Sequence, residues 1–423
     1  MNVKELLAGK PECSCGKAHV CPIDSVIIGK NACEGLAELC QDYTNILLVA
    51  DNNTYECGGE KLKAIVGEKI ADTLVFNTTS VLVPDEKALA AIEARITPQT
   101  DLIIGIGSGV INDLCKHVSF NAGLRYFIVA TAPSMDGYAS KGAALILDGM
   151  KVTTNADVPK AIIGDVDILK NAPFDMIQAG YGDIIGKYSC LNDWKLSNLV
   201  NGEYICQEVL AATYEEVEKT VRLADGLVKR EDTAIAALME ALVAVGILMA
   251  YVGNSRPASG SEHHFSHYFE IVGIVRGEEY LPHGIDVCYS AIETAKIRKE
   301  LIAIEDISDC KYCFDRENYE SNIKRVYGKL ADEVLALQNK LDWYSQDRVA
   351  IYREKWQDIR KLLADCPSAE EMRALTEKVG LSYDSFTEFY GKEKIADAYL
   401  YAKDLKDRYT VLWLYYDLFA NKQ

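Results

Sequence analysis

The sequence predicts an α/β domain with a parallel sheet over residues 1–170, followed by an all-α domain over residues 171–423. Three observations support this fold class. At 423 residues the chain is too long for one ordinary hydrophobic core. Before residue 170, short β-branched runs alternate with helical stretches, which is typical of a parallel sheet covered by helices on both faces. After Asn171-Ala172-Pro173 such runs are few, and long stretches with a 3.6-residue period replace them.

Five strands are expected in the first domain, after a Cys-rich segment over residues 1–22. The strands cover, in chain order, Val26–Gly29, Asn45–Ala50, Thr73–Phe76, Asp101–Gly105 and Tyr126–Ala130. The helices between them cover Asn31–Gln41, a segment that ends at Gly67, Asp85–Arg95 with its acidic first turn, and a segment that ends at Asn121.

The second domain is expected to contain helices over Tyr214–Lys229, Ser321–Asn339 and Arg348–Leu363. A further stretch, Ala234–Val252, is almost long and apolar enough for a membrane span, which needs about 20 apolar residues. It contains the charged residue Glu240, and it is the one stretch of this kind in the sequence. We therefore expect a helix buried on all sides inside the helical domain, and no membrane insertion.

Charge and cysteine content narrow the choice of partners and compartment. The formal net charge is −18 and the pI is near 4.9, which argues against nucleic acid or an anionic membrane surface as a partner. An anionic small substrate would need a local basic pocket. The thirteen cysteines are odd in number, and no apolar leader follows Met1. Reduced thiols and a cytoplasmic location are therefore expected.

A glycine-rich loop follows the expected strand Asp101–Gly105, with Gly107-Ser108-Gly109 leading into a helix. Glycines at such a turn let backbone amides approach a pyrophosphate, with the helix N-terminus facing the negative charge. The spacing is G-x-G-x-G and not the usual G-x-G-x-x-G, so the loop alone is a weak signal of a nucleotide site.

Asp51 stands at the end of the expected strand Asn45–Ala50. An acidic residue at that place would accept hydrogen bonds from an adenosine ribose and repel a 2′-phosphate, which favours NAD(H) over NADP(H). A helix N-cap or turn residue is an equally good interpretation of a single aspartate.

Histidine is rare in this chain, and four of its six histidines lie close together: His263, His264, His267 and His283. Neutral imidazole is the commonest protein ligand for zinc, nickel and iron. A polar helix end with surface histidines would explain one of them. Four at this spacing favour a metal site or a proton-transfer site.

Five motifs give the chain a resemblance to a known family: GIGSGVIND (105–113), TAPSMDGYAS (131–140), YGDIIGK (181–187), SRPASGSEHHFSH (255–267) and LPHGID (281–286). The chain resembles sn-glycerol-1-phosphate dehydrogenase, and more closely its bacterial branch found with arabinose operons. That family lies within the glycerol dehydrogenase, iron-containing alcohol dehydrogenase and dehydroquinate synthase group. The resemblance implies a nucleotide-binding α/β domain, an all-helical metal-binding domain, and an active site in the cleft between them.

The resemblance also implies roles for particular residues. The metal ligands would be Asp183, His263 and His283. The dinucleotide would contact Gly107, Ser108, Gly109, Thr131, Ser134 and Ser140. Substrate contacts would be Asp136, Asp183 and His267, of which Asp183 and His267 are the catalytic pair. His267 follows His263 by one helical turn and would relay a proton or hold a substrate hydroxyl. His264 receives no role.

Alternatives exist for single members of this set. Asp183 could be a helix N-cap, and His283 a turn histidine with its hydrogen bonds satisfied. Three basic residues in the motif regions, Lys141, Lys187 and Arg256, are candidates for a phosphate pocket, but the sequence assigns none of them.

The expected function is a metal-dependent, NAD(H)-linked interconversion of dihydroxyacetone phosphate and sn-glycerol 1-phosphate. The expected cofactors are NAD(H) and one divalent metal per chain, with zinc, nickel and iron as candidates. The expected partner is the small phosphorylated triose or glycerol substrate, and a homo-oligomer is expected. Three rivals remain: a dehydrogenase of an unphosphorylated polyol such as glycerol, a dehydroquinate-synthase-like lyase, and a metal- or nucleotide-binding protein without activity.

A second cluster of metal-ligating residue types stands in the N-terminal segment: Cys13, Cys15, His19 and Cys21. Four soft ligands in nine residues make a plausible second metal site. Ordinary reduced thiols are favoured, because the cluster lacks the second half of a zinc-finger pattern. The Cys310-Lys311-Tyr312-Cys313 pair is interpreted as incidental.

Overall fold

The computed structural model describes residues 2–79, 81–147 and 150–419, and these form two compact units. The first unit comprises Met1–Ile184 and Glu215–Asn254, and the second comprises Ile185–Tyr214 and Ser255–Gln423. The units are defined by contacts, whereas the expected domains were defined by the change in secondary structure near residue 170. That boundary stays a prediction.

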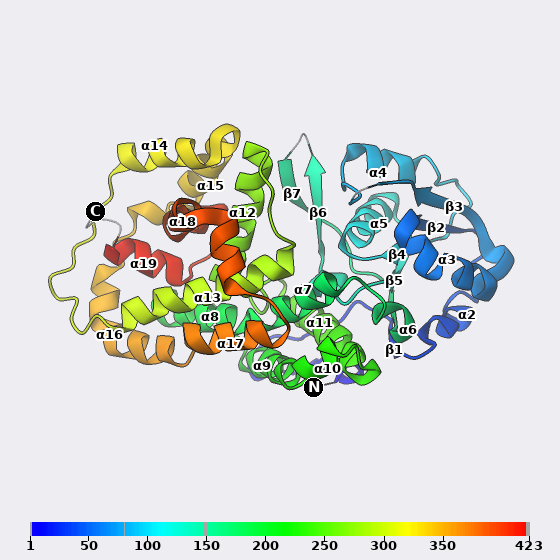
Figure 1. The fold of residues 1–423 in the computed structure, drawn as a ribbon, viewed down its shortest axis with the longest axis horizontal. Helices are drawn as coiled ribbons and strands as arrows, with labels where there is room; N and C mark the ends of the chain where they lie inside the picture. Colours follow the sequence, from blue (N-terminus) through cyan, green and yellow to red (C-terminus); the bar gives the residue numbers. More distant parts are fainter. Residues whose placement is uncertain (1, 80, 148–149, 420–423) are drawn as a thin grey trace. The chain divides into compact units, whose positions relative to one another are not determined.

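The first unit contains a six-stranded sheet in which all neighbouring strands are parallel (Figure 1). Its order is β1-β8-β5-β4-β2-β3. The strands are β1 (Ser25–Gly29), β2 (Ile46–Asp51), β3 (Ile70–Phe76), β4 (Leu102–Gly107), β5 (Arg125–Ala130) and β8 (Ala161–Asp165). All five expected strands are present, and β8 is one that the sequence pattern did not predict. A separate antiparallel pair consists of β6 (Gly142–Leu147) and β7 (Met150–Asn155).

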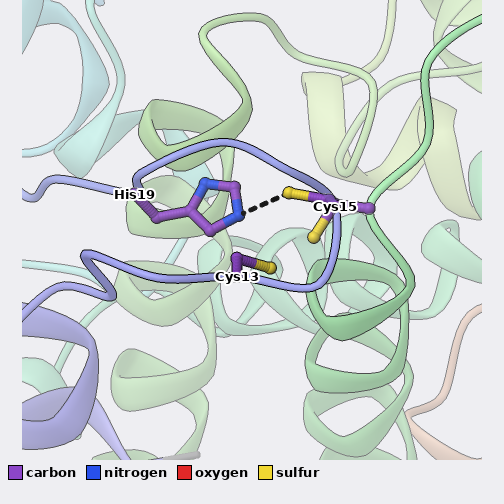
Figure 2. Close-up of side chains that lie close together, drawn as sticks. Cys13, Cys15 and His19 are labelled. Atoms are coloured by element: carbon purple, nitrogen blue, oxygen red, sulfur yellow. Dashed lines mark hydrogen bonds between the residues drawn. The ribbon is translucent and has the colours of Figure 1, made fainter.

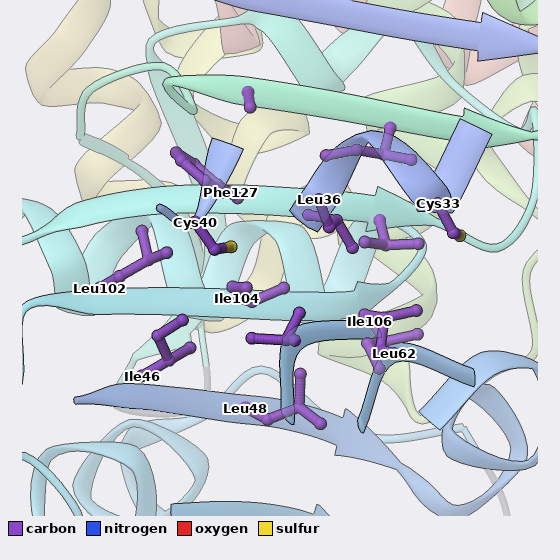
Figure 3. Packing of buried hydrophobic residues seen from close by; sticks show 14 of the residues in the cluster. Cys33, Leu36, Cys40, Ile46, Leu48, Leu62, Leu102, Ile104, Ile106 and Phe127 are labelled. Carbon is purple, nitrogen blue, oxygen red and sulfur yellow. The ribbon is translucent and has the colours of Figure 1, made fainter. Parts of the chain in front are cut away.

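Alternate residues of the central strands form one apolar face of the sheet. Residues 46, 48 and 50 of β2 and residues 102, 104 and 106 of β4 belong to a single buried cluster, as the two-residue period of a strand requires. Figure 3 shows this cluster with Cys33, Leu36 and Leu62 packed over the strands. β2 and β4 are buried along almost their whole length, because helices cover both faces of a parallel sheet.

The helices of the first unit are short, apart from α3, α5, α7 and α11. They are α1 (Val3–Leu7), α2 (Leu36–Leu39), α3 (Asn52–Val66), α4 (Glu86–Glu93), α5 (Gly109–Ala122), α6 (Val166–Leu169), α7 (Phe174–Ile185), α10 (Ala224–Val228) and α11 (Asp232–Val252). The helix expected over Asn31–Gln41 is instead a 3₁₀ turn, η1 (Ala32–Gly35), followed by the single turn of α2. A helix α9 (Gln207–Arg222) connects the second unit to the first.

Helix α11 is the one described helix that is long and apolar enough to cross a membrane, and 78% of its apolar window is buried within the protein. Its contacts are with α1, α6, α10, β1 and the 3₁₀ turn η3 (Asp136–Ala139). It is thus a buried core helix, as expected. However, it packs on elements of the α/β unit and not inside the helical one.

The described part of the second unit is all-helical and is arranged around one central helix, α13 (His283–Ile302). α13 contacts α8 (Lys187–Asn201), α12 (Ser261–Arg276), α16 (Val349–Ala364), α17 (Ala369–Lys378) and α19 (Val411–Phe419). The remaining helices are α14 (Arg316–Tyr327), α15 (Ala331–Leu341) and α18 (Tyr383–Tyr401). The single helix expected over Ser321–Asn339 is divided into α14 and α15 at Gly328, whose φ of +50° no α-helix contains.

Candidate active site

The carboxyl edge of the sheet has a topological switch point between β2 and β4. The chain moves outward from β2 to β3 and then returns to the other side of β2, where β4, β5 and β8 follow. In open parallel sheets, ligands bind in the crevice at the carboxyl ends of strands where the order reverses. Two predicted nucleotide contacts lie at this point: Asp51 ends β2, and Gly107 ends β4.

The glycine-rich loop turns tightly from β4 into α5. A Cβ on Gly107 would lie 2.5 Å from Cβ of Ile111, so only glycine lets the first turn of α5 approach the strand this closely. The Gly107 carbonyl accepts a hydrogen bond of 3.1 Å from the Thr131 amide. The Ser108 and Ser134 hydroxyl oxygens lie 2.7 Å apart. The first unit therefore brings Gly107, Ser108, Thr131 and Ser134 together at the N-terminus of α5.

The N-terminus of α5 has the geometry of an anion site. Ser108 is its N-cap residue but makes no side-chain cap hydrogen bond. A Cβ on Gly109 would meet only Met135 at 3.7 Å, an ordinary contact, so packing alone does not require glycine there. The first amides of a helix that no side chain caps can bind a phosphate group.

Asp51 is the N-cap of α3. Its Oδ1 accepts a hydrogen bond of 2.9 Å from the Thr54 amide, and the Thr54 hydroxyl lies 3.0 Å from the Asp51 amide. The N-cap interpretation is therefore correct. A role in coenzyme binding is compatible with it, because a carboxylate has lone pairs for both contacts.

Buried groups hold the Thr131–Ser140 loop from several sides. Lys116, which is fully buried in α5, donates to the carbonyl oxygens of Gly137 at 2.9 Å and Gly142 at 3.0 Å, and lies 3.4 Å from the Ser140 hydroxyl. Burial lowers the pKa of Lys116, and the nearby Asp113 carboxylate partly offsets this. Lys116 is a site-forming residue that the sequence pattern did not reveal.

Helix α7 packs against the same loop through a glycine. A Cβ on Gly180 would stand 1.9 Å from the carbonyl oxygen of Pro133, so any side chain there would push the helix away. One turn later in α7, Asp183 accepts a hydrogen bond of 2.9 Å from the Asp136 amide through Oδ2. Asp183 lies near the end of α7 and α8 begins after Gly186, so Asp183 is not an N-cap.

Three of the four clustered histidines face one another in the second unit. The ring centroids of His263 and His283 lie 5.1 Å apart, those of His267 and His283 5.4 Å, and those of His263 and His267 6.3 Å. His263 and His267 are one turn apart on α12, and His283 is the first residue of α13. His283 is thus a helix-start residue and not a turn histidine.

Hydrogen bonds orient two of these rings. Nδ1 of His263 lies 2.7 Å from the Glu262 carboxylate, and Nδ1 of His283 lies 3.1 Å from the Ser266 hydroxyl. With both Nδ1 atoms so engaged, Nε2 is the nitrogen that a metal would take. A carboxylate or hydroxyl partner on the other ring nitrogen is the usual outer shell of a metal-binding histidine.

The start of α12 is fixed by contacts with α8. A Cβ on Gly260 would lie 2.6 Å from Cα of Cys190, so glycine is needed for this close approach. The Ser261 amide donates to Asp193 Oδ2 at 2.7 Å, and Asp193 is paired in turn with the buried Arg298 at 2.8 Å. The turn that carries Glu262 and His263 is therefore rigidly supported.

Comparison with known proteins identifies related sequences and structures. Residues 27–173 match the iron-containing alcohol dehydrogenase family. Glycerol-1-phosphate dehydrogenase [NAD(P)+] of Halalkalibacterium halodurans is 33% identical over 295 residues, which are 68% of this chain and 74% of that protein. The Bacillus subtilis protein of the same name is 34% identical over 291 residues, 66% of this chain and 72% of that protein. The chain belongs to the glycerol-1-phosphate dehydrogenase family.

Solved structures show the same fold at low identity. The sulfoacetaldehyde reductase from Bifidobacterium kashiwanohense in complex with NAD+ has a TM-score of 0.59 at 15% identity, with 95% of this chain and 98% of that chain covered. An iron-containing alcohol dehydrogenase from Corynebacterium glutamicum has a TM-score of 0.58 at 15% identity, with 94% and 95% covered. These likenesses establish the expected fold class: an α/β part with a parallel sheet, followed by a helical part.

Two other residues of the motifs, Arg256 and His264, have structural roles in this member of the glycerol-1-phosphate dehydrogenase family. Arg256 forms a two-pronged ion pair with Glu203, with Nε 2.7 Å from Oε1, and also donates to the Tyr409 carbonyl. His264 is fully buried, and neither ring nitrogen has a hydrogen-bond partner among the described residues. Burial lowers the pKa of His264 well below its ordinary value. Arg256 is therefore a weak candidate for the phosphate pocket, and His264 is a core residue.

Proposed function

We propose that this protein uses NADH and a divalent metal to reduce dihydroxyacetone phosphate to sn-glycerol 1-phosphate, and also catalyses the reverse reaction. The proposal is supported by membership of a family whose members are named glycerol-1-phosphate dehydrogenase [NAD(P)+]. The observation that supports it most is the trio of histidines whose rings face one another, with Glu262 and Ser266 bonded to two of them.

The proposed metal ligands are Asp183, His263 and His283. One carboxylate and two imidazoles are three protein ligands, which leaves positions for substrate as a catalytic site requires. When bound, the metal acts as a Lewis acid on the substrate carbonyl oxygen. Mixed nitrogen and oxygen ligands accept zinc, nickel or iron, so the metal is identified by reconstituting the metal-free protein with each ion. Placement of the active site in a cleft between the domains stays a prediction.

Single alanine replacements test the ligand set. Asp183→Ala, His263→Ala and His283→Ala should each lose both bound metal and turnover. His117, the histidine of α5 outside the cluster, provides the matched control, and His117→Ala should keep both. Retention of metal and turnover by any one of the three variants would remove that residue from the set.

The proposed role of His267 is to hold a substrate hydroxyl or transfer the proton to the developing alkoxide oxygen. It lies next to the two ligand rings and one turn from His263. Asp136 is a second proposed substrate contact, and its amide is already fixed by Asp183. His267→Asn should lower kcat by about 100-fold or more without loss of metal, because general acid–base groups contribute about 10²–10⁴.

The proposed coenzyme site is the carboxyl edge of the sheet. Gly107, Ser108, Gly109, Thr131, Ser134 and Ser140 would contact the dinucleotide. A preference for NAD(H) over NADP(H) is proposed from Asp51, whose negative charge at the end of β2 would repel a 2′-phosphate.

Substrate choice and product stereochemistry decide between the candidate functions. The protein is incubated with NADH, a divalent metal and either dihydroxyacetone phosphate or dihydroxyacetone, and the product is assayed enzymatically for its enantiomer. We expect NADH oxidation with the phosphorylated substrate and formation of the 1-phosphate. A preference for dihydroxyacetone would indicate a polyol dehydrogenase, and the 3-phosphate would contradict the family activity. Turnover without net NADH oxidation would indicate a lyase.

The compartment and the oligomeric state are also proposals. None of the thirteen cysteines forms a disulfide bond, which supports a reducing, cytoplasmic location. A homo-oligomer remains the expected state, and light scattering of the purified protein tests it. The aromatic residues near the C-terminus give no support for an interface, because Trp413 is buried in α19 and packs against Tyr344 of its own unit.

A further inference from the structure

The N-terminal segment forms a short hairpin in the first unit. Lys10 and His19 exchange two backbone hydrogen bonds of 2.8 Å, and Gly16 closes a turn by donating to the Cys13 carbonyl at 2.9 Å. Gly16 has a φ of +80°, a conformation that favours glycine. The hairpin brings Cys13, Cys15 and His19 to one place (Figure 2).

The three side chains have the spacing of ligands around one ion. Their sulfur and nitrogen atoms all lie within 4.8 Å of one another. Sγ of Cys15 lies 3.4 Å from Nε2 of His19. For a tetrahedral zinc ion with Zn–S of about 2.3 Å and Zn–N of about 2.0–2.1 Å, the sulfur-to-nitrogen distance is about 3.6 Å. A zinc ion therefore fits with only a small movement of these atoms.

The orientation of His19 also fits metal binding. Its Nδ1 lies 3.0 Å from the carbonyl oxygen of Tyr251, which can only accept, so Nδ1 carries the proton. Nε2 then presents its lone pair toward Cys15. The ring is buried and stacks on Tyr251 with the centroids 5.1 Å apart and the planes 9° apart. A backbone carbonyl on the far nitrogen is the usual outer partner of a histidine ligand.

We propose that Cys13, Cys15 and His19 bind a zinc ion, as three of its four ligands. Each cysteine gives its thiol proton to solvent when the zinc–sulfur bond forms, so two protons leave and two thiolates remain on the ion. Thiolate and imidazole ligands favour zinc over magnesium or calcium. The ion cross-links the hairpin and orients His19 on α11, so its role is to stabilise the first unit.

This inference revises the interpretation of the sequence, in which ordinary thiols were favoured. The second half of a zinc-finger pattern is missing from the sequence, but the Tyr251 carbonyl on α11 orients the His19 ring from 232 residues away. Cys21, the fourth member of the sequence cluster, is not part of the group.

Metal analysis of purified variants tests the site independently of catalysis. Zinc is counted in the wild-type protein, Cys15→Ser, Cys57→Ser and His283→Ala. Cys57 is an exposed cysteine of α3 and serves as the matched control. We expect Cys15→Ser to lose roughly one zinc per chain relative to Cys57→Ser. His283→Ala should keep that zinc, so failure of the proposed catalytic site would not be mistaken for failure of this one.

A thiol assay covers the case in which Cys15→Ser does not fold. Wild-type protein is treated with a thiol reagent before and after addition of a strong chelator. Two thiols, identified by peptide mapping as Cys13 and Cys15, should become reactive only after chelation. The proposal is wrong if these thiols react as fast as Cys57 without chelator, or if Cys15→Ser folds and contains as much zinc as Cys57→Ser.

Discussion

Nδ1 of His263 lies 2.7 Å from the carboxylate of Glu262, its immediate neighbour in α12. Adjacent residues of a helix do not normally face each other. Here Glu262 is in the first turn, and the same oxygen that faces His263 accepts a 2.9 Å hydrogen bond from the Gly260 amide. Burial raises the pKa of Glu262, but hydrogen bonds from His263 and the Gly260 amide outweigh it and leave the pKa below its ordinary value. The buried carboxylate is thus positioned to make the His263 ring more basic, which would strengthen the proposed metal ligand.

Glu262→Gln should lower the affinity for the metal by about 10- to 100-fold, as loss of an outer partner usually does. Glutamine keeps the shape and can still accept from the ring, but the negative charge is lost. Chelator competition measures the affinity, and Glu388→Gln, on the exposed face of α18, is the control. An unchanged affinity in Glu262→Gln would show that the carboxylate only caps the start of α12.

Asp51→Asn separates the observed cap of α3 from the proposed coenzyme contact of Asp51. Asparagine caps a helix as well as aspartate does, so the melting temperature should hardly change. A charged hydrogen bond to the ribose would become a neutral one, at a loss of about 1 kcal/mol, and the ratio of kcat/KM for NADH over NADPH should fall by roughly fivefold or more. Asp51→Ala should lower both the ratio and the melting temperature. If the ratio does not move in Asp51→Asn, Asp51 is a helix cap alone.

Gly107→Ala should lower the stability of the protein, whereas Gly109→Ala should weaken NADH binding. Alanine at position 107 would collide with Ile111, at a cost of about 1–3 kcal/mol, so urea unfolding should shift to lower concentration. Alanine at position 109 meets only an ordinary contact, so stability should be kept. Its methyl group would nevertheless stand in the path of the pyrophosphate at the proposed coenzyme site. NADH binding, followed by fluorescence, should weaken about tenfold, or about 1.4 kcal/mol. Normal NADH binding by Gly109→Ala would place the pyrophosphate elsewhere.

Lys61→Met should destabilise the first unit in a pH-dependent way. Burial raises the pKa of Asp165, but the Lys61 ammonium, 2.8 Å away, and the Cys33 amide outweigh it and hold the pKa below its ordinary value. A depressed folded pKa contributes stability that is complete above the unfolded pKa of about 3.9 and is lost as the pH falls through the folded value.

The cost of Lys61→Met near pH 7 should be about 1–2 kcal/mol, less than for a fully buried pair because the Lys61 side chain is 38% exposed. Urea unfolding at several pH values measures it. The difference from wild type should be constant from about pH 8 to 5 and shrink below about pH 4. Lys63→Met on the same helix is the control, because the Lys63 side chain is about as exposed as that of Lys61 but its partner Glu60 is 4.0 Å away and exposed. A difference that grows with acid would contradict this account.

The sequence predicted five of the six strands of the parallel sheet because each central strand is a continuous apolar run between turn residues. It missed β8, since Ala161-Ile162-Ile163-Gly164 is short and its burial comes from neighbours β1 and β5, which are distant in sequence. It joined α14 and α15 because the helical period continues through Gly328, and only the φ of +50° reveals the break.

The candidate site shows the same limit. Motifs identified the glycine loop and the histidines, whose residue types carry chemistry. Lys116, Gly180 and Gly260 were not identified, because their importance comes from carbonyls and helices far away along the chain. Gly180, for example, is required because the Pro133 carbonyl oxygen occupies the space that a Cβ would fill. For the same reason the sequence could not show that His19 is held by Tyr251.

The return of residues 215–254 to the first unit has a consequence for synthesis on the ribosome. The sheet strands are all made by residue 165, but α11, which packs on β1 and on the Asp136–Ala139 turn, is complete only at Val252. The apolar surface that α11 covers is therefore exposed on the nascent sheet until Val252 has been made. Helix α8 is made during that time, but its packing partners α12 and α13 follow only after α11. A chaperone that shields this surface would act after the last strand, β8, has been made and before α11 is complete.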